Sequence, residues 1–263
     1  MNGRDRAQGR GGRGRAPGNG WRERHARSFG GDVGAYARSR PGYPDRVVDW
    51  LVPTGARDVV DLGAGSGALT RSLVARGLAV TAVQPSESMR AALAKSLPAV
   101  PVVAGTAKSI PLPAASADAV LCAQAWHWVD PDRAGPEVAR VLRPGGLLGL
   151  VWNDRTVTDE WSAELDRLVL AGQPGTPGGW RAPDAGPGFA LARGPDVSWT
   201  QWLTPTGLVD LVASRSYVLV LDHRERADVL TRASGLAQRW AAAAGSDRLG
   251  VTYTTHSWRA TRG

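Results

Sequence analysis

The stretch that decides the fold of this chain is residues 59–70, which read VVDLGAGSGALT. An apolar run ends in an acidic residue and meets three glycines at alternate positions, and a helix-like segment follows. Glycine is needed where a backbone turns sharply or approaches a ligand closely, because a Cβ would clash there. A strand that leads into a glycine-rich turn and a helix N-terminus presents N–H groups in a cleft beside the sheet. The stretch therefore predicts a site for a nucleotide or a nucleoside.

Asp61 narrows the kind of ligand. It stands two residues before the first glycine, so its carboxylate is expected beside the cleft. A negative group at that place opposes a diphosphate and favours a cationic or ammonium-bearing ligand. Taken by itself, the spacing Gly63-x-Gly65-x-x-Ala68 is also compatible with a dinucleotide-binding fold, so the glycines alone do not choose the cofactor.

Strand and helix patterns alternate on both sides of this stretch. Apolar, β-rich runs predict strands at 58–62, 78–83, 100–104, 117–123 and 147–152. The run at 117–123 is continuous rather than alternating, as expected for a strand buried on both faces. The segments between these runs predict helices at 67–76, from Ser86 onward, and at 131–142. The alternation indicates an α/β fold with a doubly wound parallel sheet.

The second half of the chain is less regular. From Gly172 to Asp196, twelve of twenty-five residues are Gly or Pro, which predicts a long loop or lid without a helix or strand. Beyond it we expect short strands at 197–202 and 218–221, a helix at 224–243 and a closing strand at 251–258. One domain is therefore expected over 28–263.

The basic character of the chain belongs to its N-terminal tail. Residues 1–27 hold eight arginines against two acidic residues, so they carry +6 of the net charge of +8. This Gly/Arg-rich tail almost lacks aliphatic residues and is expected to be disordered. An RNA-binding arm, a disordered leader and a start codon placed too far upstream all remain open. The near-neutral body and the absence of a base-methylation motif (Asn/Asp-Pro-Pro-aromatic) after the 117–123 strand disfavour a nucleic-acid acceptor.

The cysteine count and the hydropathy of the chain limit the classes of protein to which it can belong. The single cysteine, Cys122, lies in an apolar run, so we expect a core residue and neither a disulfide nor a cysteine-based zinc site. His, Asp and Cys residues form no pattern typical of a metal site. No apolar stretch approaches the ~20 residues of a membrane span, so a cytoplasmic protein is expected. The oligomeric state is left open.

Further motifs stand in a fixed order around the glycine stretch. They are Tyr36-Ala37-Arg38, Arg40-Pro41-Gly42-Tyr43-Pro44, Gly105-Thr106-Ala107, Gln124-Ala125-Trp126-His127-Trp128, Val141-Leu142-Arg143-Pro144-Gly145-Gly146 and the closing segment from Tyr253 to Trp258. On these motifs the chain resembles the class I S-adenosylmethionine (SAM)-dependent methyltransferases over about residues 29–258. More narrowly, it is similar to the small-molecule branch with a Gln-Ala-aromatic-His-Trp motif, related to aconitate-type methyltransferases. The resemblance implies a Rossmann-like seven-stranded sheet with a final antiparallel strand.

The resemblance also implies which residues hold SAM. The glycine loop would wrap its methionine and ribose parts, Asp61 would support its ammonium group, and residues 84–89 and 106–107 would meet the nucleoside. The expected cofactor-binding residues are Tyr36, Asp61, Gly63, Ala64, Gly65, Gly67, Gln84, Pro85, Met89, Thr106, Ala107, Gln124 and Ala125. Relatives normally carry Asp or Glu at the position of Gln84, to grip both ribose hydroxyls. Glutamine forfeits the charge-assisted bonds, so weaker SAM binding is expected.

The acceptor side is predicted less sharply. Tyr36, Tyr43, Trp126 and Trp128 could form the aromatic walls that suit a dispersing positive charge. His127 is either the catalytic base or a residue that shapes the pocket, and a carboxylate acceptor would need no base. Arg38 and Arg40 either bind an anionic substrate or pair with surface carboxylates. The expected substrate-binding residues are Arg40, Tyr43, Trp126, His127 and Trp128.

The sequence thus predicts methyl transfer from SAM to a small-molecule acceptor, an O- or N-nucleophile that includes carboxylates, by in-line displacement. Two alternatives stay open. A degenerate methyltransferase fold could act as a binding protein, for which Gln84 gives a reason. An NAD(P)-dependent oxidoreductase would need an acidic ribose partner or an arginine cluster after the second strand, and neither is present.

Overall fold

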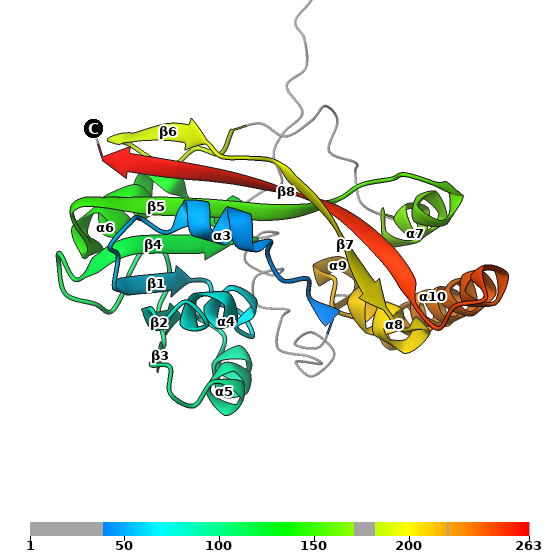
Figure 1. Ribbon diagram of the computed structural model, residues 1–263. Helices are drawn as coiled ribbons and strands as arrows, with labels where there is room; N and C mark the ends of the chain where they lie inside the picture. Colours follow the sequence, from blue (N-terminus) through cyan, green and yellow to red (C-terminus); the bar gives the residue numbers. More distant parts are fainter. Residues whose placement is uncertain (1–38, 171–181, 220, 263) are drawn as a thin grey trace, which may run out of the picture.

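One sheet organises the part of the chain that the computed structural model describes, residues 39–170, 182–219 and 221–262 (Figure 1). The order across the sheet is β3-β2-β1-β4-β5-β8-β6, and β7 also pairs with β8. The strands are β1 (Asp58–Leu62), β2 (Ala79–Val83), β3 (Val102–Val103), β4 (Ala117–Ala123), β5 (Leu142–Arg155), β6 (Phe189–Arg193), β7 (Val197–Leu203) and β8 (Leu249–Arg262). Strands β1 to β5 pair in parallel, and β8 runs antiparallel to β5, β6 and β7. The Rossmann-like α/β fold with a final antiparallel strand is confirmed.

Helices cover both faces of the parallel part. The helices are α3 (Asp45–Leu51), α4 (Ala68–Val74), α5 (Glu87–Ser96), α6 (Pro131–Val141), α7 (Glu160–Leu170), α8 (Pro205–Ala213), α9 (Ser216–Leu219) and α10 (His223–Ala244), with a 3₁₀ turn η2 at Trp126–Trp128. Ala119 and Leu121 of β4 pack with α3 and α4, whereas Val120 and Cys122 pack with α6 on the other face. Full burial of a Leu or Val side chain contributes about 1.5–3 kcal/mol. The prediction that this strand is buried on both faces is confirmed.

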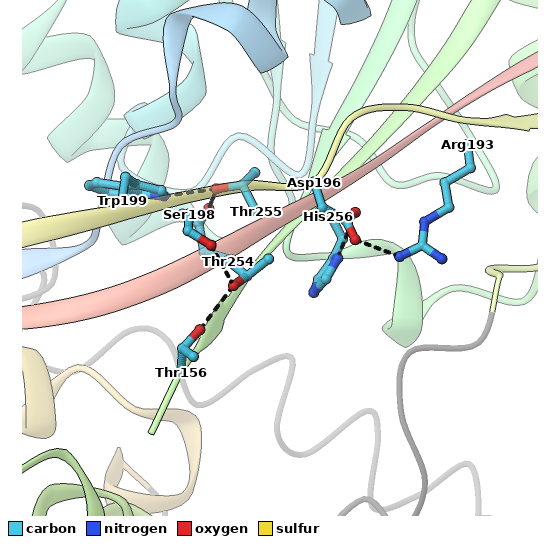
Figure 2. A network of polar contacts seen from close by, with 9 residues as sticks. Thr156, Arg193, Asp196, Ser198, Trp199, Thr254, Thr255 and His256 are labelled. Atoms are coloured by element: carbon cyan, nitrogen blue, oxygen red, sulfur yellow. Dashed lines mark hydrogen bonds and ion pairs between the residues drawn. The ribbon is translucent and has the colours of Figure 1, made fainter. Parts of the chain in front are cut away.

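The sheet has one strand more than predicted, because two separate strands, β6 and β7, pair with the outer side of β8. Strand β6 pairs with the end of β8 and strand β7 with its beginning, and the segment 194–196 lies between them. Pro195 has no N–H for the ladder, so pairing stops there. Asp196 instead contacts β8 by its side chain, with Oδ1 at 2.9 Å from His256 Nδ1, and Arg193 Nη2 donates to Oδ2 at 2.7 Å (Figure 2).

The described part of the predicted 172–196 loop is therefore not all irregular. Strand β6 lies within it, so the expectation of no strand there is wrong. The glycines and prolines flank a five-residue β run, which the overall composition of the segment concealed. The predicted strand at 218–221 is also wrong, because α9 occupies Ser216–Leu219. Short apolar runs fit either element, and here the packing against α8 and α10 decides. The tail, Tyr36, Arg38 and residues 171–181 lie outside the described residues.

A second core lies at the far end of β7 and β8. Helices α7, α8 and α10 gather there, away from α3, α4 and α6 (Figure 1). Its buried members include Leu208, Leu211 and Val212 of α8, Leu236 of α10 and Tyr253 of β8. We call α7–α10 the helical unit. Asp222 caps α10 in a capping box with Glu225, and Gly245 ends the helix in the left-handed conformation.

Candidate active site

A cleft opens at the carboxyl ends of β1, β4 and β5. The chain leaves β1 toward β2 on one side and later returns to β4 on the other, and ligands of open α/β sheets bind at such a switch point. The cleft is continuous with solvent, and the space between its walls is about 540 Å³ when open solvent is included. Its lining residues are Arg40, Pro41, Tyr43, Asp61, Gly63, Ala64, Gly65, Ser66, Ala68, Leu69, Ala123, Gln124, Asn153, Arg215 and Tyr253.

The glycine loop forms the first wall of this cleft. Gly63, Gly65 and Gly67 all have positive φ angles, of 75°, 57° and 89°, which L side chains rarely adopt. The N–H groups of Gly63 and Ala64 donate to Val83 O of β2, at 2.8 and 3.3 Å, and fix where the loop begins. A Cβ on Gly63 would stand only 3.0 Å from Ala125 Cβ. The loop conformation therefore needs glycine, as the sequence predicts.

Asp61 lies at the buried floor of the cleft. It is 1% exposed, and Thr70 Oγ1 of α4 donates to its Oδ2 at 2.6 Å. Its Oδ1 has no hydrogen-bond partner within the described part of the chain. Burial raises the pKa of Asp61 to about 6, and the hydrogen bonds from Thr70 offset this only in part. A cationic donor in the cleft would pair with Oδ1 and stabilise the ionised form.

Gln124 ends β4 in a strained conformation. Its φ is +57°, which is uncommon for a residue with a side chain, and such strain gathers at functional sites. Its N–H donates to Val151 O at 2.9 Å, and its Nε2 donates to Asn153 O at 3.1 Å. Asn153 in turn donates from Nδ2 to Gly42 O at 2.8 Å. The two amides join the end of β4 to the segment before α3, and both line the cleft.

Asn153 is also held from β8. Thr255 Oγ1 donates to Asn153 Oδ1 at 2.6 Å, and Trp199 Nε1 donates to Thr255 Oγ1 at 2.8 Å. Figure 2 shows the Trp199–Thr255 contact beside a second row, in which Thr254 Oγ1 lies between Thr156 Oγ1 and Ser198 Oγ. The Asn153 side chain therefore has a fixed orientation at the cleft.

Other residues predicted for the cofactor lie near the loop but outside the lining of the cleft. Gln84 is buried at the end of β2, and its N–H donates to Val103 O at 3.0 Å. Met89 is 1% exposed on α5, where Ser86 caps the helix, and Pro85 is exposed. Thr106 and Ser109 exchange two backbone hydrogen bonds in a tight turn, and Ala107 packs in the core beside α6.

The predicted aromatic and basic residues separate into two groups. Arg40 and Tyr43 do line the cleft. Trp126 does not: it is 3% exposed in the core beside α6, and its Nε1 donates to Asp184 O at 2.7 Å. His127 and Trp128 follow it in η2, with ring centroids 4.5 Å apart, and they are not among the lining residues either.

The hydrogen bond at His127 limits it as a base. Trp152 Nε1 donates to His127 Nδ1 at 3.2 Å, so Nδ1 is the acceptor nitrogen. A neutral imidazole has one acceptor nitrogen, and Nε2 then carries the proton. The only basic nitrogen of His127 is thus already used by the indole. This geometry favours the pocket-shaping interpretation of His127.

Sequence reasoning missed several lining residues. They are Pro41, Ser66, Ala68, Leu69, Ala123, Asn153, Arg215 and Tyr253. Ser66, Ala68 and Leu69 belong to the glycine stretch itself and Ala123 to the strand before Gln124, so proximity to those motifs could have found them. Asn153 ends a predicted strand whose carboxyl end shares an edge with Gln124, and that was a usable signal. Arg215 and Tyr253 reach the cleft only through the tertiary packing of the helical unit, and no local pattern marks them.

Comparisons with known proteins agree with this geometry. Residues 60–150 match the family model described as a methyltransferase domain. An uncharacterized methyltransferase of Mycobacterium tuberculosis (strain ATCC 25618 / H37Rv) is 50% identical over 234 residues, 89% of this chain and 95% of the relative. A methyltransferase-like protein of Schizosaccharomyces pombe is 32% identical over 238 residues, covering 87% of this chain and 93% of that protein. A solved structure of an Anaeromyxobacter dehalogenans protein assigned to the type II methyltransferases shares 27% identity at a TM-score of 0.63, over 85% of this chain and 97% of that chain.

The chain belongs to the methyltransferase family. It is a SAM-dependent methyltransferase, and its cofactor is SAM. The residues present fit that cofactor, because the unpartnered Oδ1 of buried Asp61 can pair with an ammonium group. The glycine loop likewise leaves room where a Cβ at Gly63 would crowd Ala125. Within the described residues, no helix has the length and apolarity needed to cross a membrane.

Proposed function

We propose that this methyltransferase acts on a small-molecule acceptor, an oxygen or nitrogen nucleophile that includes carboxylates. The observation that carries the proposal is the cleft itself, which opens at the carboxyl ends of parallel strands, where open α/β sheets bind small ligands, and is lined by Asp61, Gln124 and Asn153. The Gln-Ala-aromatic-His-Trp motif at 124–128 supports the small-molecule branch related to aconitate-type methyltransferases. When bound, SAM supplies a methyl group on a sulfonium.

The proposed cofactor residues divide by the part of SAM that they would meet. Asp61 supports the ammonium group, and the loop from Gly63 through Ala64 and Gly65 to Gly67 encloses the methionine and ribose parts. Gln84 accepts from a ribose hydroxyl, with Pro85, Met89, Thr106 and Ala107 around the adenine. Gln124 and Ala125 border the reacting centre. The neighbourhood of this loop, β2 and β4 in the fold supports the assignment.

Positioning is the main contribution expected from the chain. An in-line displacement needs the nucleophile, the methyl carbon and the leaving sulfur on one axis, and such alignment can supply several kcal/mol. Three hydrogen bonds hold the side-chain amides of Gln124 and Asn153: the first donates to Asn153 O, and the second donates to Gly42 O and accepts from Thr255 Oγ1. These amides can therefore orient an acceptor without reorganising. Tyr43 adds an aromatic wall. His127, bound to Trp152, acts by shaping the η2 turn.

Radiolabelled SAM tests the proposal. The purified chain is incubated with methyl-labelled SAM and a panel of carboxylic acids, phenols and amines, and labelled product is measured. Transfer to a panel member is the expected result. If S-adenosylhomocysteine binds but no small molecule is methylated, the degenerate-fold alternative is favoured. Transfer only to RNA or protein would contradict the small-molecule proposal.

A further inference from the structure

The end of the cleft opposite the glycine loop contains an unexplained buried hydroxyl. Tyr253 of β8 is 1% exposed, and its ring stacks on Trp199 with centroids 5.4 Å apart and planes 28° apart. Among the residues that the structure describes, its Oη has no hydrogen-bond partner, although Tyr253 lines the cleft. A buried hydroxyl without a partner costs about 1–3 kcal/mol, and an acceptor atom on a ligand in the cleft would remove that cost.

Arg215 also lines the cleft, on a backbone that the helical unit holds in place. Arg215 lies between α8 and α9, where its N–H donates to Val212 O at 3.1 Å. Its carbonyl accepts from the N–H groups of Val218 and Leu219, each at 3.0 Å. Val212 and Val218 are fully buried in the helical unit, so the backbone that carries Arg215 rests on a packed core. The helical unit thereby presents a cation to the cleft.

The guanidinium of Arg40 contacts the backbone beside Arg215. Arg40 comes from the segment before α3, and its Nη2 donates to Ser214 O at 2.8 Å, at the peptide that leads into Arg215. Gln201 Nε2 of β7 donates to Ser39 O at 3.1 Å and holds the same segment from the other side. Both arginines line the cleft. Two cations from distant parts of the chain therefore meet at one place.

This place is separate from Asp61. In the sheet, Asp61 of β1 pairs with Leu121 of β4, and Leu121 pairs with Gly149 of β5. Tyr253 of β8 pairs instead with Arg155 of β5. From Gly149 to Arg155 the strand advances six residues, about 20 Å at roughly 3.3 Å per residue. Burial raises the pKa of Asp61, and only hydrogen bonds from Thr70, rather than an arginine, lower it. The cleft thus has an acidic end and a basic end.

We propose that the basic end, formed by Arg215, Arg40 and the Tyr253 hydroxyl, binds a carboxylate of the methyl acceptor. This inference rests on the proposed function and adds that the acceptor is an acidic small molecule. A guanidinium presents paired N–H groups that match the two oxygens of a carboxylate, and a phenol adds a third donor. Both arginines and Tyr253 line the same cleft, and SAM itself carries one net positive charge, so an anionic acceptor offsets the charge of the bound cofactor.

Binding measurements on the protein loaded with S-adenosylhomocysteine test this inference. The probes are aliphatic and aromatic mono- and dicarboxylates, each paired with its neutral primary amide, titrated by calorimetry. The variants are Arg215→Gln and Tyr253→Phe, and the control is Arg224→Gln, which removes an exposed arginine from α10 in the same helical unit. Tyr253→Phe deletes only the unpartnered hydroxyl, so its melting temperature is not expected to fall.

At least one carboxylate is expected to bind wild type ten or more times more tightly than its amide. Arg215→Gln and Tyr253→Phe should each reduce that preference at least fivefold, and Arg224→Gln should keep it. Equal binding of carboxylates and amides, no binding of any probe, or an unchanged preference in both variants would overturn the inference.

The methionine part of the cofactor also carries a carboxylate, which is the other group that the basic end could bind. Binding of S-adenosylhomocysteine and of 5′-methylthioadenosine, which lacks the amino-acid part, is therefore measured for each variant. We expect both affinities to be unchanged in Arg215→Gln. If only S-adenosylhomocysteine binds more weakly, the guanidinium serves the cofactor and the inference fails. If wild type binds neither nucleoside, the proposed function itself fails.

Discussion

The two ends of the cleft are built in different ways. The acidic end takes Asp61, Gly63, Gly65 and Leu69 from one unbroken stretch of sequence. The basic end takes Arg40, Arg215 and Tyr253 from three distant places, joined only by the folded sheet and the helical unit. A site made by one local stretch can be read as a motif. A site assembled by tertiary packing cannot, and this is why the sequence indicates a cofactor more readily than an acceptor.

The two ends also differ in which atoms contact a ligand. At the glycine loop, backbone conformation and the lack of Cβ atoms shape the surface. At the basic end, side-chain donors do so, and their backbones have ordinary conformations. Substitutions should therefore act through space and strain at the first end and through charge and hydrogen bonding at the second.

The largest effect is expected for Gly63→Ala. Its φ of +75° costs an L residue about 1 kcal/mol or more, and the new Cβ would press on Ala125 Cβ at 3.0 Å. We expect affinity for S-adenosylhomocysteine to fall about 100-fold, roughly 2.7 kcal/mol, by calorimetry. Gly77→Ala is the matched control, because Gly77 has the same φ of +75° but nothing within 4 Å. That variant should lose similar stability and keep its affinity, and equal losses of affinity in both would refute a local effect.

Asp61→Asn should have the next largest effect on binding. Loss of a charge-assisted bond costs about 1.5–3 kcal/mol, so S-adenosylhomocysteine should bind about 10- to 100-fold more weakly at pH 7.5. Stability should change in the opposite direction, because the variant no longer ionises a buried acid. The pKa shift of Asp61 from 3.8 to about 6 corresponds to about 3 kcal/mol at most. Denaturant unfolding of the ligand-free proteins measures this gain.

The pH dependence of Asp61 has a definite sign. Because its folded pKa is raised, the protonated form stabilises the fold below pH 3.8, and this contribution is lost as the pH rises through about 6. The cofactor's ammonium group needs the ionised form, so wild-type affinity should fall as the pH drops below about 6. Asp61→Asn should show neither trend. A wild-type affinity that is flat between pH 5 and pH 8 would contradict the ammonium contact.

Gln84→Glu should produce a smaller gain. A carboxylate at the end of β2 can form a charge-assisted pair with ribose hydroxyls, worth about 1 kcal/mol more than the amide, or about fivefold in affinity. Calorimetry with S-adenosylhomocysteine checks this change. An unchanged or weaker affinity would show that Gln84 does not meet the ribose.

Deletion of residues 1–27 should have the smallest effect. The tail carries most of the net positive charge but none of the residues assigned to the cleft. Affinity for S-adenosylhomocysteine and the melting temperature should stay within error of the full chain. A large loss of either would show that the tail contributes to the fold or to the site.

In the parallel half of the fold, local sequence patterns predicted the first and last residues of some strands correctly. Strands β1 and β4 occupy the expected ranges 58–62 and 117–123, and Ser86 caps α5. These elements have strong patterns, because their side chains are buried on both faces or repeat at helical spacing. The antiparallel edge was harder, since β6 is a short run among glycines and prolines whose only partner is β8, about 70 residues later in the chain.

In the candidate site, too, residues set by local sequence were predicted and residues set by tertiary packing were not. Asp61 and the glycines lie where the motif predicts, because the conformation of the loop depends on its own residues. Trp126 was expected at the acceptor but packs in the core, since a short 3₁₀ turn directs it toward Asp184. Arg215 and Tyr253 depend on how the helical unit packs against β7 and β8, which no local pattern specifies.

Titration with S-adenosylhomocysteine and with NAD⁺ in parallel is the most direct test of the central claim, that the acidic end of the cleft binds the amino-acid part of SAM. The account predicts one bound S-adenosylhomocysteine per chain, weakened by both Gly63→Ala and Asp61→Asn, and no uptake of NAD⁺. Uptake of NAD⁺ with no response to millimolar S-adenosylhomocysteine would contradict it.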